Sequence, residues 1–380
     1  MDLAVLARLV PPTLRPLAKR FYVRSLPAQR RRVLLARRMR AQASWCASLG
    51  SPMYASLLTD TATDIERAGI CWELLGGREP TPYGVDDALP LRFMGAVHRL
   101  VLEGRAPELA PYYPSVGGDS SRDGMHGTFR RAVAANSGAL PGIIDQPVQT
   151  NEVGRTAVLV PGFLVVARTT GLPLRVLELG ASAGLNLRWD YYRYEADGLG
   201  WGPPTSAVRF RDVYAEGLPP FDVAAEVVER RGCDLSPLDP RSPDDRLTLL
   251  SYVWPDQIER IATLRGAFEI AARVPAEVES GDAVEWAETK LASAAPGVAT
   301  VVFHSLMLQY VPAAGRARLE QVLHEAGRNA SSAAPLAWLR MEWGAKDVEL
   351  RLRTWPENDD RLLATGGHHG RDIHWLAETD

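Results

Sequence analysis

The sequence predicts an α/β protein, in which a helical N-terminal domain precedes a Rossmann-like sheet that is mostly parallel and finishes with antiparallel strands. After Gly171, apolar segments of strand length alternate with helical segments, the pattern of a parallel sheet with right-handed crossovers. The first apolar strand ends in a turn of small residues. No segment of residues 1–165 has the pattern of a strand. We therefore expect a helical domain over residues 1–165 and a sheet domain over residues 166–380.

Three segments predict the helices of the first domain. Helices are expected at 31–49, at 53–68 and at 91–103, and Gly50-Ser51-Pro52 and Gly69 end the first two. A loop rich in Pro, Gly and Tyr follows over residues 106–124. We expect this domain to be a lid or a substrate-binding domain.

The sheet domain is predicted from apolar runs that are bounded by turn residues. Strands are expected at 174–179, 223–228, 276–279, 298–303, 336–341 and 348–355, and helices at 256–272 and 317–326. Residues 190–221 carry many Gly, Pro and aromatic side chains and fit the alternation badly. We expect them to form an insertion.

Composition narrows the class of protein. Hydrophobic residues make up 46% and charged residues 23% of the chain, the balance of a soluble globular protein. The three cysteines are widely spaced and form no C-x-x-C pair, which argues against a disulfide framework and a thiolate zinc site and indicates the cytoplasm. We expect no metal site, no signal peptide and no membrane span, since the apolar run at 156–167 is too short. The sequence does not indicate an oligomeric state.

One segment of the chain is strongly basic, although the chain as a whole is nearly neutral. The net charge is −3, yet residues 15–40 hold ten basic side chains and no acidic one. Such a run can bind RNA or a membrane, but it is more often a solvated helix face. We therefore expect no nucleic-acid partner.

The loop after the first strand carries the main functional signal. Gly180 and Gly184 bracket Ser182, and Glu178 lies two residues before the first glycine. Glycines let backbone N–H groups approach a ligand, and a following helix would point its positive end at the same place. The pattern predicts a nucleotide-like ligand at the carboxyl edge of the sheet. Because G-x-S-x-G also marks the nucleophile elbow of α/β-hydrolases, a serine hydrolase that uses Ser182 stays an alternative.

Three polar residues are expected where later strands end. Asp234 is expected to bind ribose hydroxyls and Asp282 the adenine amino group, although either could instead cap a helix. His304 is expected after its strand as a general base, or as a histidine satisfied by loop backbone.

A polar segment precedes the apolar run at 156–167. Asn151 and Arg155 are candidate substrate-binding residues, with Arg155 suited to a carboxylate, and Glu152 is a second candidate base. Capping of a helix by Thr150 or Asn151 is the alternative. Tyr112, Gln309 and Tyr310 are further candidates for the substrate site, whereas the pair His368-His369 is expected at the surface.

Several phrases resemble a known family. They are Pro-Val-Gln-Thr-Asn-Glu-Val-Gly-Arg, Leu-Glu-Leu-Gly-Ala-Ser-Ala-Gly-Leu-Asn-Leu, Gly-Cys-Asp-Leu-Ser-Pro-Leu-Asp-Pro, Ser-Tyr-Val-Trp-Pro-Asp-Gln and Val-Val-Phe-His-Ser. They look like the bacterial family of domain of unknown function 2332, over roughly residues 32–375. That label implies no reaction.

Residues 174–352 are also similar to class I S-adenosylmethionine-dependent methyltransferases, although Ser182 stands where those enzymes more often have glycine. This resemblance implies S-adenosylmethionine as cofactor, contacts from Gly180, Ala181, Gly184 and Asp282, and methyl transfer to a small molecule. A non-catalytic binding or regulatory protein with the same fold is the other alternative.

Overall fold

The structure, a computed structural model, describes residues 25–78 and 88–377. It divides the chain into two compact units. The first comprises Met1–Thr150 and Leu247–Ile261, and the second comprises Asn151–Arg246 and Ala262–Asp380. The expected boundary at residue 165 lies inside a helix of the second unit, α9 (Thr156–Thr170).

The described part of the first unit is built from helices, as its sequence predicts. They are α3 (Ala28–Ser48), α4 (Pro52–Glu66), α5 (Ile70–Leu75), α6 (Leu89–Leu102), η2 (Pro107–Tyr112), η3 (Pro114–Val116), α7 (Met125–Ala135) and α8 (Leu140–Ile144). The three expected helices are confirmed with ends shifted by up to three residues. The Ser51 side chain caps α4 by accepting a hydrogen bond from Tyr54 N, and Pro52 follows at the first helical position.

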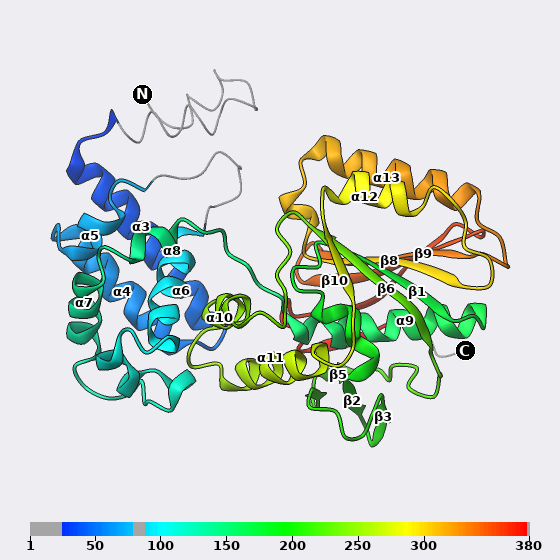
Figure 1. Cartoon of the computed structure of the whole chain (residues 1–380), viewed down its shortest axis with the longest axis horizontal. Coiled ribbons are helices and arrows are strands. Elements are labelled where there is room, and N and C mark those ends of the chain that lie inside the picture. The colour runs from blue at the N-terminus through cyan, green and yellow to red at the C-terminus, as the bar shows by residue number, and fades with distance from the viewer. Residues whose placement is uncertain (1–24, 79–87, 378–380) are drawn as a thin grey trace. The chain divides into compact units, whose positions relative to one another are not determined.

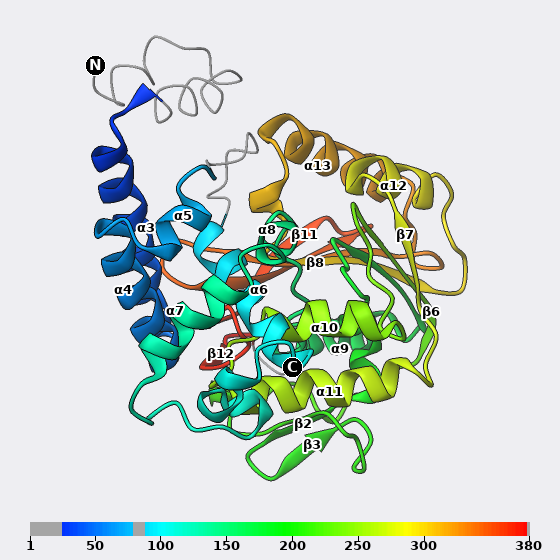
Figure 2. The same ribbon diagram turned by 60° about the vertical axis from the view of Figure 1, so that its left-hand side comes forward.

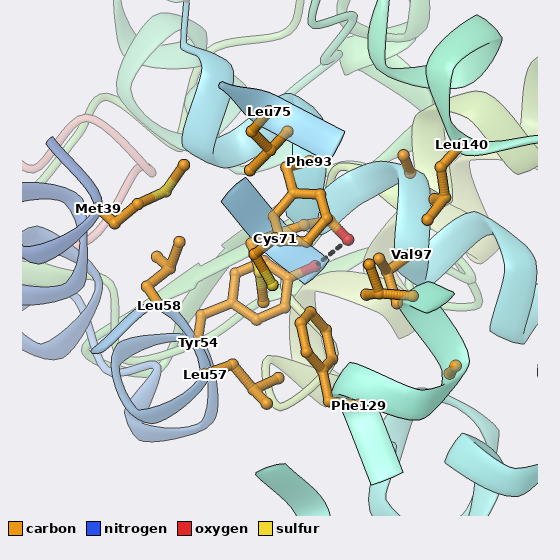
Figure 3. Close-up of a cluster of buried hydrophobic side chains, with 14 of the residues drawn as sticks. Met39, Tyr54, Leu57, Leu58, Cys71, Leu75, Phe93, Val97, Phe129 and Leu140 are labelled. Carbon is orange, nitrogen blue, oxygen red and sulfur yellow. Dashed lines mark hydrogen bonds between the residues drawn. The ribbon is translucent and has the colours of Figure 1, made fainter. Parts of the chain in front are cut away.

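The core of this unit is mainly aliphatic and aromatic (Figure 3). Phe93 and Phe129 meet edge to face with ring centroids 5.8 Å apart. The buried Tyr54 hydroxyl donates to the Met94 carbonyl at 3.3 Å, so its polar end is satisfied inside the core. Residues 15–24 of the basic run lie outside the described residues. Within α3, Arg40 pairs with Glu66, and Arg31 and Arg32 lie over the Trp72 ring.

The second unit contains a sheet of nine strands. In spatial order they are β5 (Tyr214–Glu216), β12 (Ile373–Trp375), β11 (Asp359–Gly366), β10 (Val348–Trp355), β9 (Leu336–Trp343), β8 (Ala299–Ser305), β1 (Leu174–Leu179), β6 (Val227–Asp234) and β7 (Glu277–Ser280). Strands β7, β6, β1, β8 and β9 are parallel to one another. Strands β10, β11 and β12 then continue antiparallel from β9, and β5 pairs parallel with β12 at the edge. The expected parallel sheet with an antiparallel finish is therefore confirmed.

The order of the parallel strands reverses beside β1. From β1 the chain moves outward through β6 to β7 and then returns to the other side of β1 with β8 and β9. In doubly wound sheets the ligand crevice lies outside the carboxyl ends of the strands at such a reversal. In this chain that place is the edge where β1 and β8 end.

Helices cover both faces of the sheet (Figures 1 and 2). Helices α12 (Ala283–Lys290) and α13 (Ala313–Arg328) lie on one face and α9 on the other. Leu177, Val302 and Trp338 pack in the core cluster beneath α12 and α13. On the opposite face Phe163 of α9 meets Phe303 edge to face at 5.1 Å. Helices α10 (Pro243–Ser251) and α11 (Ile258–Ala271) each contribute residues to both units.

The expected insertion is a small sheet with its own order, β3-β2-β4. It comprises β2 (Arg193–Ala196), β3 (Leu199–Trp201) and β4 (Arg209–Phe210), and β5 returns the chain to the edge of the main sheet. Two expectations nearby are wrong. The segment after the glycine loop is a 3-10 helix, η5 (Leu185–Tyr191), interrupted at Arg188. The second strand is Val227–Asp234 instead of 223–228.

Within the described ranges, every helix is too short or too polar to cross a membrane.

Candidate functional site

The loop after β1 has a backbone that only special residues adopt easily. Gly180, Ser182 and Gly184 all have positive φ, at 70°, 52° and 66°. A Cβ on Gly184 would lie 2.7 Å from Val278 Cγ2, and a Cβ on Gly180 would lie 2.6 Å from Met307 Cγ. Both glycines are therefore required by packing as well as by conformation.

Most backbone amides of this loop already have protein acceptors. The N–H groups of Ala181, Ser182, Gly184 and Leu185 donate to Cys233 O, Asp234 Oδ2, Ala181 O and Asn151 Oδ1, at 2.7–2.9 Å. Residues 181–184 are buried, and Gly180 alone is exposed. The expected cradle of open amides is wrong for these four groups. The expected helix dipole is also lacking, because η5 is a short 3-10 helix.

Asp234 links two loops at the end of β6. Its Oδ2 accepts from Ser182 N and its Oδ1 accepts from Ser236 N, both at 2.9 Å. The half-buried carboxylate thus performs a capping role within the loops, while its ribose contact stays a prediction.

Asp282 follows β7 and caps helix α12. Its Oδ1 accepts from Val284 N at 2.8 Å and from Glu285 N at 3.2 Å. Among the described residues, none donates to Oδ2 of this exposed side chain. The capping alternative is therefore present, and the adenine contact stays a prediction that one oxygen could serve.

Glu178 lies inside β1 with its side chain buried. Its Oε2 atom and the Oδ1 atom of buried Asn186 have no hydrogen-bond partner in the described structure. Burial raises the pKa of the Glu178 carboxyl well above its usual range, against smaller opposing effects from Asn186, Arg188 and Arg155. Asn186 was not expected in the site, although its place in the loop phrase was visible in the sequence.

His304 lies within β8, not after it, and its side chain is fully buried. Trp338 Nε1 donates to His304 Nε2 at 3.0 Å, so the ring carries its hydrogen on Nδ1 and faces Glu342 Oε1 at 2.7 Å. Because both ring nitrogens of His304 have hydrogen-bond partners inside the protein, this geometry suits a structural role better than the role of a general base. Sequence reasoning missed Glu342 and Trp338, which come from the next strand of the sheet.

The polar segment before α9 joins three parts of the second unit. Arg155 donates to Ser305 O at the end of β8 (3.0 Å) and to His368 O (3.2 Å). Glu152 Oε1 accepts from Gly154 N, and Glu152 Oε2 lies 2.9 Å from His369 Nδ1. The pair His368-His369 is therefore not a simple surface feature, because the His369 side chain is 22% exposed and bonded to a buried carboxylate.

The remaining candidates lie at more open positions. Gln309 Nε2 donates to Leu306 O at 2.9 Å, and Tyr310 is 68% exposed in η6 (Leu308–Tyr310). Tyr112 belongs to the first unit, where its hydroxyl donates to Asp123 O at 3.3 Å. Their roles toward a substrate stay predictions.

The carboxyl edge of the sheet is rich in hydrogen-bond acceptors. Asp234 is the last residue of β6, and Asp282 lies two residues after the neighbouring strand β7. Glu178 and Asn186 add two buried acceptor atoms that have no partner among the described residues. Carboxylates accept several hydrogen bonds each, so Asp234 and Asp282 can accept further hydrogen bonds at this edge, whereas the acceptors of Glu178 and Asn186 are buried. No group of three or more His, Cys, Asp or Glu side chains could hold a metal ion within residues 25–78 and 88–377.

Comparison with known proteins identifies a family. No curated protein and no solved structure matches the chain. One family model, described as an uncharacterized protein conserved in bacteria (DUF2332), matches residues 36–375. Because that match spans most of the chain, the protein belongs to the DUF2332 family.

Proposed function

We propose that the second unit binds S-adenosylmethionine at the carboxyl edge of its sheet and that the protein transfers a methyl group to a small molecule. The observation that carries this proposal is the reversal of strand order beside β1, where exposed Gly180 follows the strand. Ligands of doubly wound sheets bind at such a reversal. The strand order β7-β6-β1-β8-β9 corresponds to the order 3-2-1-4-5 of such sheets.

The acceptors at this edge support an adenosyl ligand. In this proposal Asp234, the last residue of β6, accepts from the ribose hydroxyls in addition to the amides of Ser182 and Ser236, and Oδ2 of Asp282, after β7, accepts from the amino group. Gly180 is the exposed residue of the loop after β1, and the Met307 side chain lies against it. The cofactor, when bound, supplies an activated methyl group, and the residues of the chain bind and orient the two reactants.

Proton transfer in this proposal belongs to Glu152 rather than to His304. Glu152 holds His369 at 2.9 Å on the same segment that Arg155 ties to the end of β8. Such a carboxylate–imidazole pair is a suitable base for an acceptor hydroxyl or amine. We place the reaction in the cytoplasm, because the three cysteines are free and buried.

Two alternatives make different predictions. A non-catalytic relative would bind the cofactor without turnover. A serine hydrolase would need Ser182 exposed and paired with a histidine, but Ser182 is 4% exposed and the Nε2 atom of His304 is engaged by Trp338. A fluorophosphonate that labelled Ser182 would favour the hydrolase over the methyltransferase.

Calorimetric titration with S-adenosylhomocysteine tests the proposal. The variants are Gly180→Ala and, as matched control, Gly198→Ala, since both glycines have positive φ and a Cβ on Gly198 meets nothing within 4 Å. We expect Gly198→Ala to lower stability by about 1 kcal/mol, and Gly180→Ala to lower it by more, because its Cβ must displace the Met307 side chain. Gly180→Ala alone should weaken binding at least tenfold. Absence of binding to the wild type would overturn the proposal.

Turnover is a second measurement. The wild-type protein is incubated with S-adenosylmethionine and a bacterial metabolite extract, and S-adenosylhomocysteine is quantified by mass spectrometry. Release that depends on both extract and protein supports methyl transfer. Binding without any release would favour the non-catalytic alternative.

A further inference from the structure

One carboxylate oxygen at the end of β9 holds the loop that follows β8. Glu342 Oε1 accepts from Met307 N at 2.9 Å and from Leu308 N at 3.2 Å, and it lies 2.7 Å from His304 Nδ1. Hydrogen bonds to an ionised acceptor are stronger than those between neutral groups. A single side chain therefore fixes two successive amides of the loop and the imidazole beneath them.

A second hydrogen bond, from Trp338, fixes the orientation of the His304 imidazole. Trp338 Nε1 donates to His304 Nε2 at 3.0 Å, and both side chains are buried. If the ring turned over, the buried indole N–H would lose its acceptor, which is costly inside a core. The orientation of His304 thus directs its Nδ1–H at Glu342 and holds the carboxylate in place.

The loop needs this support because its backbone is unusual. Leu306 has φ 52°, a conformation that a branched side chain rarely adopts, and its N–H donates to Met341 O at 2.8 Å. A strained backbone conformation persists only where several surrounding interactions hold it in place. Glu342 supplies two of these interactions, because it accepts hydrogen bonds from the two residues that follow Leu306.

The loop in turn packs against the loop after β1. A Cβ on Gly180 would lie 2.6 Å from Met307 Cγ and 3.3 Å from Met307 Cβ, so the methionine side chain lies directly against the glycine. These two loops follow β1 and β8, the strands between which the order reverses. The position of Met307 therefore shapes the place where the proposed ligand would bind.

We infer that Glu342 is a positioning residue of this edge: through Met307 N and Leu308 N it sets Met307 against Gly180 and thereby sets the affinity for the adenosyl ligand. This inference rests on the proposed function. It assigns Glu342 and His304 a supporting role and no contact with the reacting atoms.

Hydrogen exchange of the full-length protein tests the positioning without any ligand. In Glu342→Ala we expect at least tenfold faster exchange at Met307 and Leu308 and a smaller increase in residues 180–184. Glu342→Gln keeps one oxygen acceptor, so it should restore part of the protection. Asp360→Ala is the matched control, because Asp360 accepts from Arg340 and Arg353 on the same sheet. Unchanged protection at Met307 and Leu308 in Glu342→Ala would overturn the inference.

A double-mutant cycle with S-adenosylhomocysteine tests the consequence for binding. Glu342→Ala and Met307→Ala should each weaken affinity about tenfold, and the double variant should be no weaker than either, because both act through one contact. Asp360→Ala should stay within twofold of the wild type. Additive losses would overturn the inference.

The two experiments distinguish failure of the proposed function from failure of the positioning inference. If the wild type binds no S-adenosylhomocysteine, the proposed function fails, and the exchange result alone then decides whether Glu342 positions residues 306–310. Should Glu342→Ala not fold, Glu342→Gln replaces it with smaller expected effects: about threefold faster exchange at Met307 and Leu308 and about threefold weaker binding, and wild-type values in both measurements would overturn the inference.

Discussion

Asp234 accepts a hydrogen bond from the backbone N–H of Ser182 at 2.9 Å, which joins the loop after β1 to the last residue of β6. Ser182 has φ 52°, so this carboxylate holds a strained residue at the centre of the glycine loop. The carbonyl of Ser182 in turn accepts from Leu238 N at 3.2 Å. The shape of the loop therefore depends on hydrogen bonds to the neighbouring strand and to the segment that follows it.

We predict that Asp234→Ala lowers the free energy of unfolding by about 2 kcal/mol, because the amides of Ser182 and Ser236 lose their acceptor. Asp234→Asn keeps one acceptor oxygen and should lose about half as much. Urea denaturation of the three proteins measures the difference. Equal stability of the alanine variant and the wild type would contradict the structural role of this carboxylate.

The two interpretations of Asp282 can be separated by two substitutions. Asp282→Ala removes the cap of α12 and should cost about 1 kcal/mol, whereas Asp282→Ser replaces one good capping residue by another and should restore stability. If Asp282 also contacts the adenosyl ligand, the serine variant still loses affinity for S-adenosylhomocysteine. Full affinity in a stable Asp282→Ser protein would leave Asp282 as a cap alone.

Glu178 should make the stability of the protein depend on pH. Its folded-state pKa is raised by burial above the unfolded value of about 4.3, so between these two values the folded state binds more protons than the unfolded state. Stability should therefore fall as pH rises through this window. Glu178→Gln removes the titration, and its advantage over the wild type should grow from pH 4 upward. Parallel pH profiles of the urea midpoints would refute this prediction.

Asn151 is predicted to stabilise the start of η5. Its buried Oδ1 accepts from Leu185 N at 2.9 Å, so Asn151→Ala should cost about 2 kcal/mol by leaving that amide unsatisfied. The control is Asn329→Ala at the exposed end of α13, which should change stability by less than about 0.5 kcal/mol. Thermal unfolding followed by circular dichroism compares them, and equal shifts would argue against the role of Asn151.

The parallel strands were predictable because a strand that is covered on both faces is a continuous apolar run. Residues 174–179, 298–303 and 336–341 come close to that pattern, with Arg175, Glu178 and Arg340 as the charged exceptions. The three segments coincide with central strands of the sheet to within two residues. The boundaries of β6 were not predictable in this way. Its polar residues Arg230 and Arg231 form ion pairs with Asp190 and Glu277, so the hydrophobic pattern is interrupted where the strand continues.

The hydrogen-bond partners of the loop residues, unlike the parallel strands, depend mainly on the tertiary structure. The sequence alone determined that Gly180 and Gly184 follow a buried strand and that acidic residues follow the next two. Only the tertiary structure decided that Asp234 pairs with a residue 52 positions away, His304 with one 38 away and Glu152 with one 217 away. Such partners are set by strand order and register, which no local pattern encodes, because they depend on how the whole chain packs.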